Sequence, residues 1–297
     1  MVIRETDDDD LEAVAALFQA ADDARVVSVE GIRHMRRMRP DRARALDLVA
    51  EVGGAVVAAG GAGRNIWTTT EGASWAFVTV AAEHRRQGIG DELGRRLLDH
   101  LRASGGTKAT SFFRWTEEGE RWAVGQGWSK LLGGPLIALD PRDVPEPSLP
   151  DGYRCISMAE LTAEDMFEAV AAAALDEPTP IPNDNFDLDE FVREWEEPDM
   201  DLDSSTAVLD DEGNVVAFSF LMVGGDRAQH GFTGTMAAHR GRGLATAAKR
   251  RALRKAAERG VTRVTTSNAE ENAAMRAINR KLGFEPIGEH VIYGRDL

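Results

Sequence analysis

The chain has 297 residues, a formal net charge of −15 and a single cysteine. This length suits two domains of about 150 residues each, whose cores need no disulfides. The lone Cys155 excludes an intrachain disulfide and a cysteine-rich metal site, and the negative charge argues against general nucleic-acid binding. No apolar run of about 18 residues marks a membrane span, and Met1 is soon followed by four consecutive aspartates. We therefore expect no signal peptide and a cytoplasmic location.

Residues 1–140 alternate strand-like and helix-like patterns. A short strand at 2–4 precedes a helix at 8–18, in which Leu11, Val14, Leu17 and Phe18 share one face. The next elements are a hairpin of strands 48–52 and 55–59, a strand at 75–80, a helix from 89 to its stop at Gly105, a strand at 107–113 and a helix ending at 127–128. This order predicts a mixed α/β sheet with flanking helices.

Four prolines within residues 140–152 predict a linker, because proline fits neither helix interiors nor sheet ladders. We place the linker at 141–152. Beyond it the same order returns, with strands at 153–156, 206–209, 215–223, 231–236 and 261–267, and helices at 162–174, from 244 to Gly260, and before Gly283-Phe284. We therefore expect two tandem α/β domains of one fold, at residues 1–140 and 153–297.

One short pattern occurs twice, 155 positions apart, each time between a strand and a helix. It reads R-x-x-G-x-G in the first half and R-x-x-G-x-A in the second. Glycines let successive N–H groups point inward, and a helix N-terminus favours negative charge. Each pattern predicts a phosphate cradle, formed by Arg85, Arg86, Gln87, Gly88, Ile89 and Gly90 and by Arg240, Gly241, Arg242, Gly243, Leu244 and Ala245.

Three stretches resemble the GNAT superfamily of N-acyltransferases: VTVAAEHRRQGIG at 78–90, TGTMAAHRGRGLA at 233–245 and TTSNAEENAAMRAINRKLGF at 265–284. The resemblance covers nearly the whole chain, in a tandem layout similar to that of mycothiol synthase. It implies that the cradles bind the pyrophosphate of acetyl-CoA and that a primary amine attacks the thioester directly. It also implies a backbone N–H before each cradle as donor to the carbonyl oxygen, at Thr235-Met236 or Val80-Ala81.

Many members of this family use a tyrosine as general acid toward the departing thiolate, four residues before the glycine of a G-F motif. Those positions hold Ala123 and Asn279, and neither tyrosine of the chain, Tyr153 or Tyr293, falls there. A thiol with a pKa near 8.5 leaves without obligatory protonation. Loss of the acid lowers the rate by roughly 10²–10⁴ without excluding catalysis.

The resemblance favours the second half as the catalytic one. Its asparagines follow a regular pattern up to Gly283-Phe284; Asn272 matches the family asparagine that contacts the coenzyme arm, and Asn279 can donate a hydrogen bond. His230, at the start of the strand that leads to the second cradle, is the candidate general base. The first half has tryptophans instead of these asparagines: Trp115, Trp122 and Trp128. We expect that half to be structural, or to hold coenzyme without turnover.

The distribution of charge along the second half suggests a class of acceptor. Residues 157–212 contain 19 acidic side chains and one basic one, whereas residues 227–281 contain 13 basic and three acidic ones. The resemblance places residues 157–205 over the acceptor pocket, where carboxylates would attract a small cationic amine. A solvated acidic face explains the same composition equally well. Five carboxylates of this segment are the alternatives to His230 as general base: Asp184, Asp187, Asp189, Glu190 and Glu194.

Two other interpretations stay open. The missing tyrosines favour a binding or regulatory protein that keeps the coenzyme fold without turnover. The tandem layout favours acetylation of a cysteinyl amine, as in mycothiol-synthase-like enzymes. His84 and His239 precede the two cradles at matched positions, and we expect them to flank the loops. No His, Cys or Asp set shows metal-ligand spacing, so we expect no metal. The negative net charge and the lack of a long apolar run lead us to expect no nucleic-acid or membrane partner.

Overall fold

We describe the fold from a computed structural model that covers residues 1–297. The strands of the first half are β1 (Val2–Glu5), β2 (Leu46–Val52), β3 (Ala55–Arg64), β4 (Ala73–Val80), β5 (Lys108–Arg114) and β6 (Ser129–Leu139). Those of the second half are β7 (Tyr153–Ser157), β8 (Thr206–Asp210), β9 (Val215–Gly224), β10 (Arg227–Thr235), β11 (Arg263–Ser267) and β12 (Glu285–Asp296). The helices are α1 (Leu11–Ala21), α2 (Val29–Met38), α3 (Ile89–Ala103), α4 (Glu117–Gly125), α5 (Ala163–Ala174), α6 (Leu188–Trp195), α7 (Leu244–Glu258) and α8 (Ala273–Leu282). The predicted mixed α/β class and the repeated order of elements are confirmed.

Helices cover both faces of the sheet in each half, because alternate strand residues point to opposite faces. In β2, Leu48 and Ala50 pack with α3, while Val49 packs with α1. In β9, Phe218 and Phe220 pack with α5, while Leu221 packs with α7. Thus α1, α2, α5 and α6 lie on one side of the sheet, and α3, α4, α7 and α8 lie on the other. None of the helices combines the length and the apolar character that a membrane span requires.

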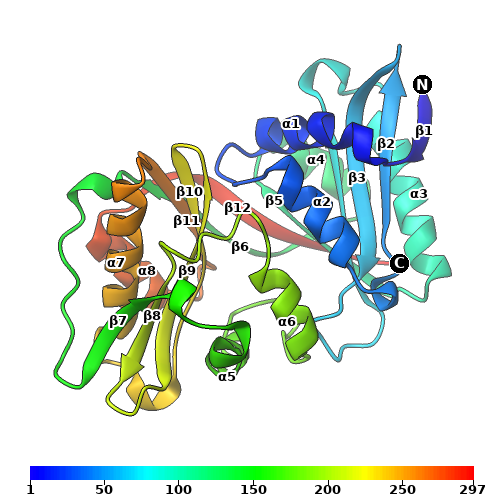
Figure 1. Ribbon diagram of the computed structural model, residues 1–297. Helices are drawn as coiled ribbons and strands as arrows, with labels where there is room; N and C mark the ends of the chain where they lie inside the picture. The colour runs from blue at the N-terminus through cyan, green and yellow to red at the C-terminus, as the bar shows by residue number, and fades with distance from the viewer.

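The two halves share one sheet because they exchange their last strands. The order is β1-β2-β3-β4-β5-β12-β6-β11-β10-β9-β8-β7. The last strand of the second half, β12, lies between β5 and β6, and β6 in turn pairs with β11. Figure 1 shows β12 running from one half to the other, so that both termini lie on the same half. The boundary between residues 140 and 153 therefore divides the sequence but not the sheet.

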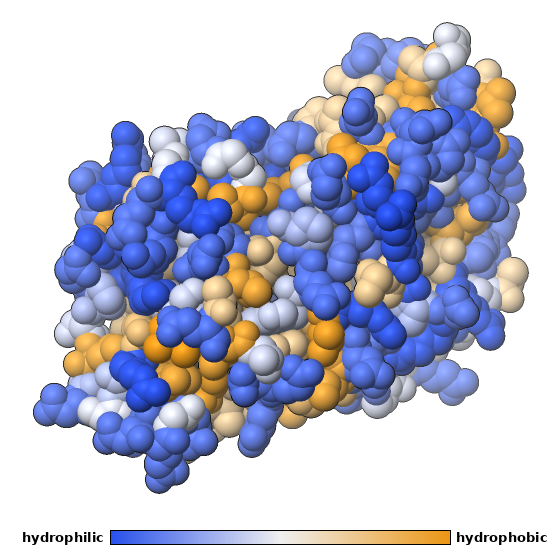
Figure 2. Space-filling view, viewed as in Figure 1, coloured by the Kyte–Doolittle hydropathy of each residue, from blue (hydrophilic) through white to orange (hydrophobic).

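Further contacts hold the halves together. The linker begins with a 3-10 turn at Pro141–Asp143, and Val144 is buried with its carbonyl accepting a hydrogen bond from Arg254 Nη1 at 3.0 Å. On the other face, α6 reaches α2, where His34 Nε2 hydrogen-bonds to the carbonyl of Arg193 at 2.7 Å. The face seen in Figure 2 is mostly hydrophilic, with apolar residues in patches on both halves as well as between them.

Two parallel strand pairs open into forks. Strands β4 and β5 pair only from Ala73 to Trp75, and β10 and β11 pair only from Arg227 to Gln229. Past these residues each pair diverges toward the cradle that follows β4 or β10. A gap in a parallel sheet leaves backbone N–H and C=O groups without ladder partners. Each fork is therefore a place where a ligand can pass between strands.

Candidate functional site

Both predicted cradles have the geometry of an anion site. Gly88 and Gly243 adopt left-handed φ values of 78° and 80° at the N-caps of α3 and α7, and no side chain caps either helix. The first N–H groups of both helices therefore lack a protein partner. A Cβ built on Gly88, Gly241 or Gly243 would meet no atom within 4 Å, so the space before each loop is open. Phosphate groups bind at such helix N-termini.

The first arginine of each cradle hydrogen-bonds to the last residue of the strand before it. Arg85 Nε donates to the carbonyl of Val80 at 3.1 Å, and Arg240 Nε donates to the carbonyl of Thr235 at 3.1 Å. The same guanidinium groups pair with Glu118 and Asp176, respectively. Some of the N–H donors of each arginine are therefore already engaged. Direct contacts between these two arginines and a phosphate do not follow from the geometry.

The other cradle residues differ between the halves. Arg242 Nη1 donates to the hydroxyl of Tyr153 at 2.7 Å, and that hydroxyl also contacts Nδ1 of His239 at 3.0 Å. Arg86, at the place of Gly241, has a positive φ of 61° and an exposed side chain. Gln87 Nε2 donates to the carbonyl of Glu83, within its own loop. Arg86 is thus the cradle arginine that stays free.

The hydrogen bonds at the ends of β4 and β10 show which backbone N–H groups are free to bind the carbonyl oxygen of a thioester. The N–H groups of Ala81 and Met236 donate to the preceding strands, at Val57 and Val216, over 2.9 and 2.8 Å. The expectation that Met236 supplies a free N–H is therefore wrong. Because alternate backbone groups of a strand point to opposite sides, the N–H groups of Val80 and Thr235 face the forks. These two remain the candidates for holding a carbonyl oxygen.

A cavity of about 1030 Å³ lies at the first fork, the half that the sequence favoured less. Its walls come from both sides of the sheet: Phe18 and Met35 on α1 and α2, and Trp122 on α4. The first cradle contributes Arg85, Arg86, Gly88 and Gly90 to the lining. The cavity therefore joins the phosphate cradle on one face to the α1/α2 side through the fork.

Two helix glycines make room in this cavity. Gly90 and Gly94 lie one turn apart on α3, and both line the cavity. A glycine inside a helix costs about 1 kcal/mol relative to alanine, which favours a steric reason for its presence. Trp122 lies 3.7 Å from a Cβ built on Gly94, and its Nε1 donates to Asp91 at 2.7 Å. Trp122 lines the cavity with a relative exposure of 36%.

The exchanged strand brings a tyrosine that the motif comparison missed. Tyr293 of β12 is buried against the first half and lines the cavity beside Ala123, where the family acid would be. Its hydroxyl donates to Oε1 of Glu120 at 2.6 Å. Burial, and then this hydrogen bond to a carboxylate, raises the pKa of Tyr293 to about 12. No local spacing could have revealed this position, because it depends on which strand lies next to β5.

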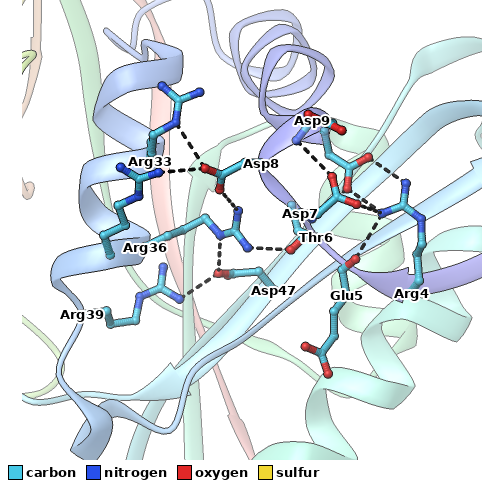
Figure 3. Close-up of polar contacts among 12 residues, drawn as sticks. Arg4, Glu5, Thr6, Asp7, Asp8, Asp9, Arg33, Arg36, Arg39 and Asp47 are labelled. Carbon is cyan, nitrogen blue, oxygen red and sulfur yellow. Dashed lines mark hydrogen bonds and ion pairs between the residues drawn. The ribbon is translucent and has the colours of Figure 1, made fainter.

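The α1/α2 wall contains carboxylates that are already bound. Asp47 pairs with Arg39 at 3.0 Å and with Arg36 at 3.5 Å, as Figure 3 shows. Asp22 accepts a hydrogen bond from His290 Nε2 at 2.7 Å, and His290 Nδ1 contacts Oγ of Ser267 at 3.1 Å. Burial raises the pKa of Asp22, but the contacts with His290 outweigh it, and the net shift is downward. A cationic acceptor would have to compete with these arginine and histidine partners.

His230 does not occupy the expected position. Strand β10 begins at Arg227, so His230 lies within the strand rather than at its start, and it is 3% exposed. Its Nδ1 contacts Ser219 Oγ and the carbonyl of Phe220. Burial, with Lys249 nearby, lowers the pKa of His230 well below its ordinary value. The ring lies on the α7/α8 side with Phe284, opposite the helices expected to cover the acceptor, so it is poorly placed as a base.

The asparagine pattern serves the fold of the second half. Asn272 caps α8, since its Oδ1 accepts from the N–H of Met275 at 3.1 Å. Asn279 is 1% exposed, and its Nδ2 donates to Oδ1 of Asn268 at 2.5 Å. The proposed coenzyme contact of Asn272 and the donor role of Asn279 therefore compete with structural uses of the same atoms.

Much of the acidic segment ties the halves together. Asp184 accepts hydrogen bonds from the N–H and hydroxyl of Thr69, both at 2.7 Å, and Asp187 caps α6. Glu190 is 5% exposed and pairs with Arg42 at 2.5 Å. These three carboxylates have structural partners, whereas Asp189 and Glu194 are exposed. No group of three or more His, Cys, Asp or Glu side chains is arranged to hold a metal ion.

Comparisons with known proteins agree with this geometry. The model of the acetyltransferase (GNAT) family matches residues 14–124 and 167–284. A tandem GNAT protein from the clavulanic acid biosynthesis pathway has a TM-score of 0.78 at 20% identity, over 99% of this chain and 98% of that one. A GCN5-related N-acetyltransferase from Sphaerobacter thermophilus has a TM-score of 0.73 at 18% identity, over 99% and 95%. A putative acetyltransferase from Pyrococcus horikoshii has a TM-score of 0.63 at 15% identity, over 100% and 89%.

None of the curated proteins matches the sequence. At these identities the solved structures establish the fold, while the family match rests on the sequence itself. The two matched stretches make up more than half of the chain and contain both cradles and both forks. The chain therefore belongs to the acetyltransferase (GNAT) family, as a tandem of two such domains.

Proposed function

We propose that the chain is an acetyl-CoA-dependent N-acetyltransferase whose reaction takes place in its first half. The observation that carries this proposal is the cavity that joins the first cradle to the α1/α2 face through the β4–β5 fork. Direct transfer needs the amine and the thioester carbonyl to meet in one place, and this cavity is lined from both sides of the sheet. The second half keeps its cradle and fork, but the described cavity does not extend to them.

The residues of the first half fit the coenzyme. The uncapped N–H groups of α3 and the free Arg86 suit a pyrophosphate, and the glycine face of α3 leaves space for an arm. When bound, acetyl-CoA supplies an acetyl thioester that an amine can attack. The N–H of Val80 faces the fork, where it would hold the carbonyl oxygen as negative charge develops. Tyr293 directs its proton to Glu120, so we assign it to holding α4 rather than to protonating the thiolate.

The walls indicate the class of acceptor. Every acidic side chain that lines the cavity already has a partner; these residues are Asp22, Asp47, Asp91 and Glu118. The acceptor side carries apolar and aromatic groups, including Phe18, Met35 and Phe77, beside the arginines Arg25, Arg36 and Arg39. We therefore propose one primary amine on an apolar body, and the earlier expectation of a cationic acceptor loses its support from the acidic segment.

The test compares two matched variants in a CoA-release assay with a panel of apolar, cationic and cysteinyl amines. Gly88→Glu and Gly243→Glu place the same charge in equivalent cradles, where a positive φ also disfavours any side chain. We expect Gly88→Glu to abolish release and Gly243→Glu to leave it within threefold. The opposite pattern would move the reaction to the second half. Saturable acetyl-CoA binding with no release for any amine would instead support a coenzyme-binding protein without turnover.

A further inference from the structure

The two halves differ at one helix position next to the coenzyme path. The cradles are 155 residues apart, so Gly94 of α3 corresponds to Lys249 of α7. Gly94 lines the cavity of the first half. The equivalent position of the second half thus carries one of the longest side chains where the first half has none.

Lys249 is enclosed rather than exposed. It is 1% exposed, and its Nζ lies 5.7 Å from the centre of the Phe284 ring. His230 of β10 packs against the same ring, with 6.3 Å between the ring centres. No carboxylate pairs with the amine, and burial alone lowers the pKa of Lys249 to about 7. The side chain therefore fills space between α7, the start of β12 and the strand that forms one arm of the second fork.

We propose that Lys249 closes the second fork to coenzyme, so that the chain binds one acetyl-CoA, in its first half. The inference rests on the proposed function, because it takes the first fork as the path of the coenzyme arm. The cradle of the second half keeps its open loop. In our proposal the Lys249 side chain fills the space that corresponds to the cavity beside Gly94 in the first half. One glycine-to-lysine difference thereby decides which half accepts the coenzyme.

The experiment is calorimetric titration of the full chain with acetyl-CoA, read as the number of sites. Lys249→Gly copies the first half and should raise the number from one to two. Lys249→Met keeps a long unbranched side chain without the charge, and it should leave the number at one. In the double variant Gly88→Glu/Lys249→Gly, a single site should remain, now in the second half. The reciprocal change, Gly94→Lys, should weaken binding at the first site at least 100-fold in a chain that still melts cooperatively.

Several outcomes of this titration would contradict the proposal that Lys249 closes the second fork. Two sites in the unmodified chain, or one site in a folded Lys249→Gly variant, would overturn the proposal. Should Lys249→Gly fail to fold, Gly94→Lys with unchanged affinity would overturn it as well. A second site opened by Lys249→Met would show that charge rather than bulk excludes the coenzyme, and would also overturn it. Failure of the proposed function looks different, because it gives no binding in any variant, or binding without acetyl transfer.

Discussion

Replacing Lys249 with methionine should stabilise the protein at neutral pH, because the folded state buries an amine that water would solvate. Burial lowers the pKa of Lys249 from 10.5 to about 7. A pKa difference of one between folded and unfolded states corresponds to about 1.4 kcal/mol. Below pH 7 the lysine therefore costs the folded state about 4–5 kcal/mol that methionine does not. Methionine replaces only part of the contact that the Lys249 amine makes with the Phe284 ring, so about 4–5 kcal/mol is an upper bound.

The pH dependence carries the sign of the effect. Between pH 7 and pH 10.5 the unfolded chain holds the proton of this lysine and the folded chain does not. The stability of the unmodified protein therefore rises with pH in this window, relative to a variant without the group. The advantage of Lys249→Met should be full at pH 6 and should shrink by about 4 kcal/mol by pH 10.

Urea unfolding of both proteins at pH 6, 8 and 10 measures this difference, provided that the slope of free energy against urea stays the same. Groups that do not contact Lys249 titrate equally in both proteins and cancel, whereas His230 loses the part of its pKa depression that comes from the Lys249 charge. Lys255→Met on the same helix is the matched control, because the Lys255 side chain is half-exposed and pairs with Glu258. Its effect should stay within about 0.5 kcal/mol at every pH. An advantage of Lys249→Met that does not change with pH would refute the reasoning.

Three further outcomes follow from contacts between the halves. Tyr293→Phe should lower stability by about 1 kcal/mol through loss of the bond to Glu120, and should change kcat less than threefold; a loss above 100-fold would make the tyrosine a proton donor. Asp22→Asn should lower Tm above a pH of about 4, where the depressed pKa keeps the Asp22 carboxylate charged. The difference in Tm should vanish as the pH falls below the pKa that Asp22 has in the folded protein. Residues 1–140 expressed alone should fail to fold by circular dichroism, because β5 and β6 lack β12 between them, and co-expression with residues 141–297 should restore a folded complex.

Local patterns predicted the cradles and most of the elements, but they did not place α2 and α6. Leu11, Val14 and Leu17 share a face in the sequence and are buried in the structure. Gly88, Gly241 and Gly243 have the left-handed φ values that a cradle needs. Such features depend on a few neighbouring residues, so the sequence contains the information directly. The family follows from the same stretches.

The location of the cavity could not be predicted, because it depends on contacts far apart in the chain. Asn272 and Asn279 were matched to a motif, but their side chains cap a helix and bind a neighbouring asparagine. Lys249 is followed by two arginines in the sequence, which suggests a basic surface. Its position on α7 nevertheless places the side chain in the protein interior. Glu190 reads as a solvated acid, yet it pairs with Arg42 of the other half. In each case the use of the side chain depends on an element that local spacing does not place.

The exchanged strands have a consequence for how the two halves diverged. A pair of identical subunits that swapped a last strand in this way would build the same central ladder, with two equal forks. One gene would then place the same residue at both helix positions, so that opening one fork would open the other. Covalent fusion through residues 141–152 keeps the swapped architecture and frees each copy to mutate alone. Gly94 and Lys249 are a difference that a pair of identical subunits could not hold, and under our proposal it leaves the reaction to one half and a structural role to the other.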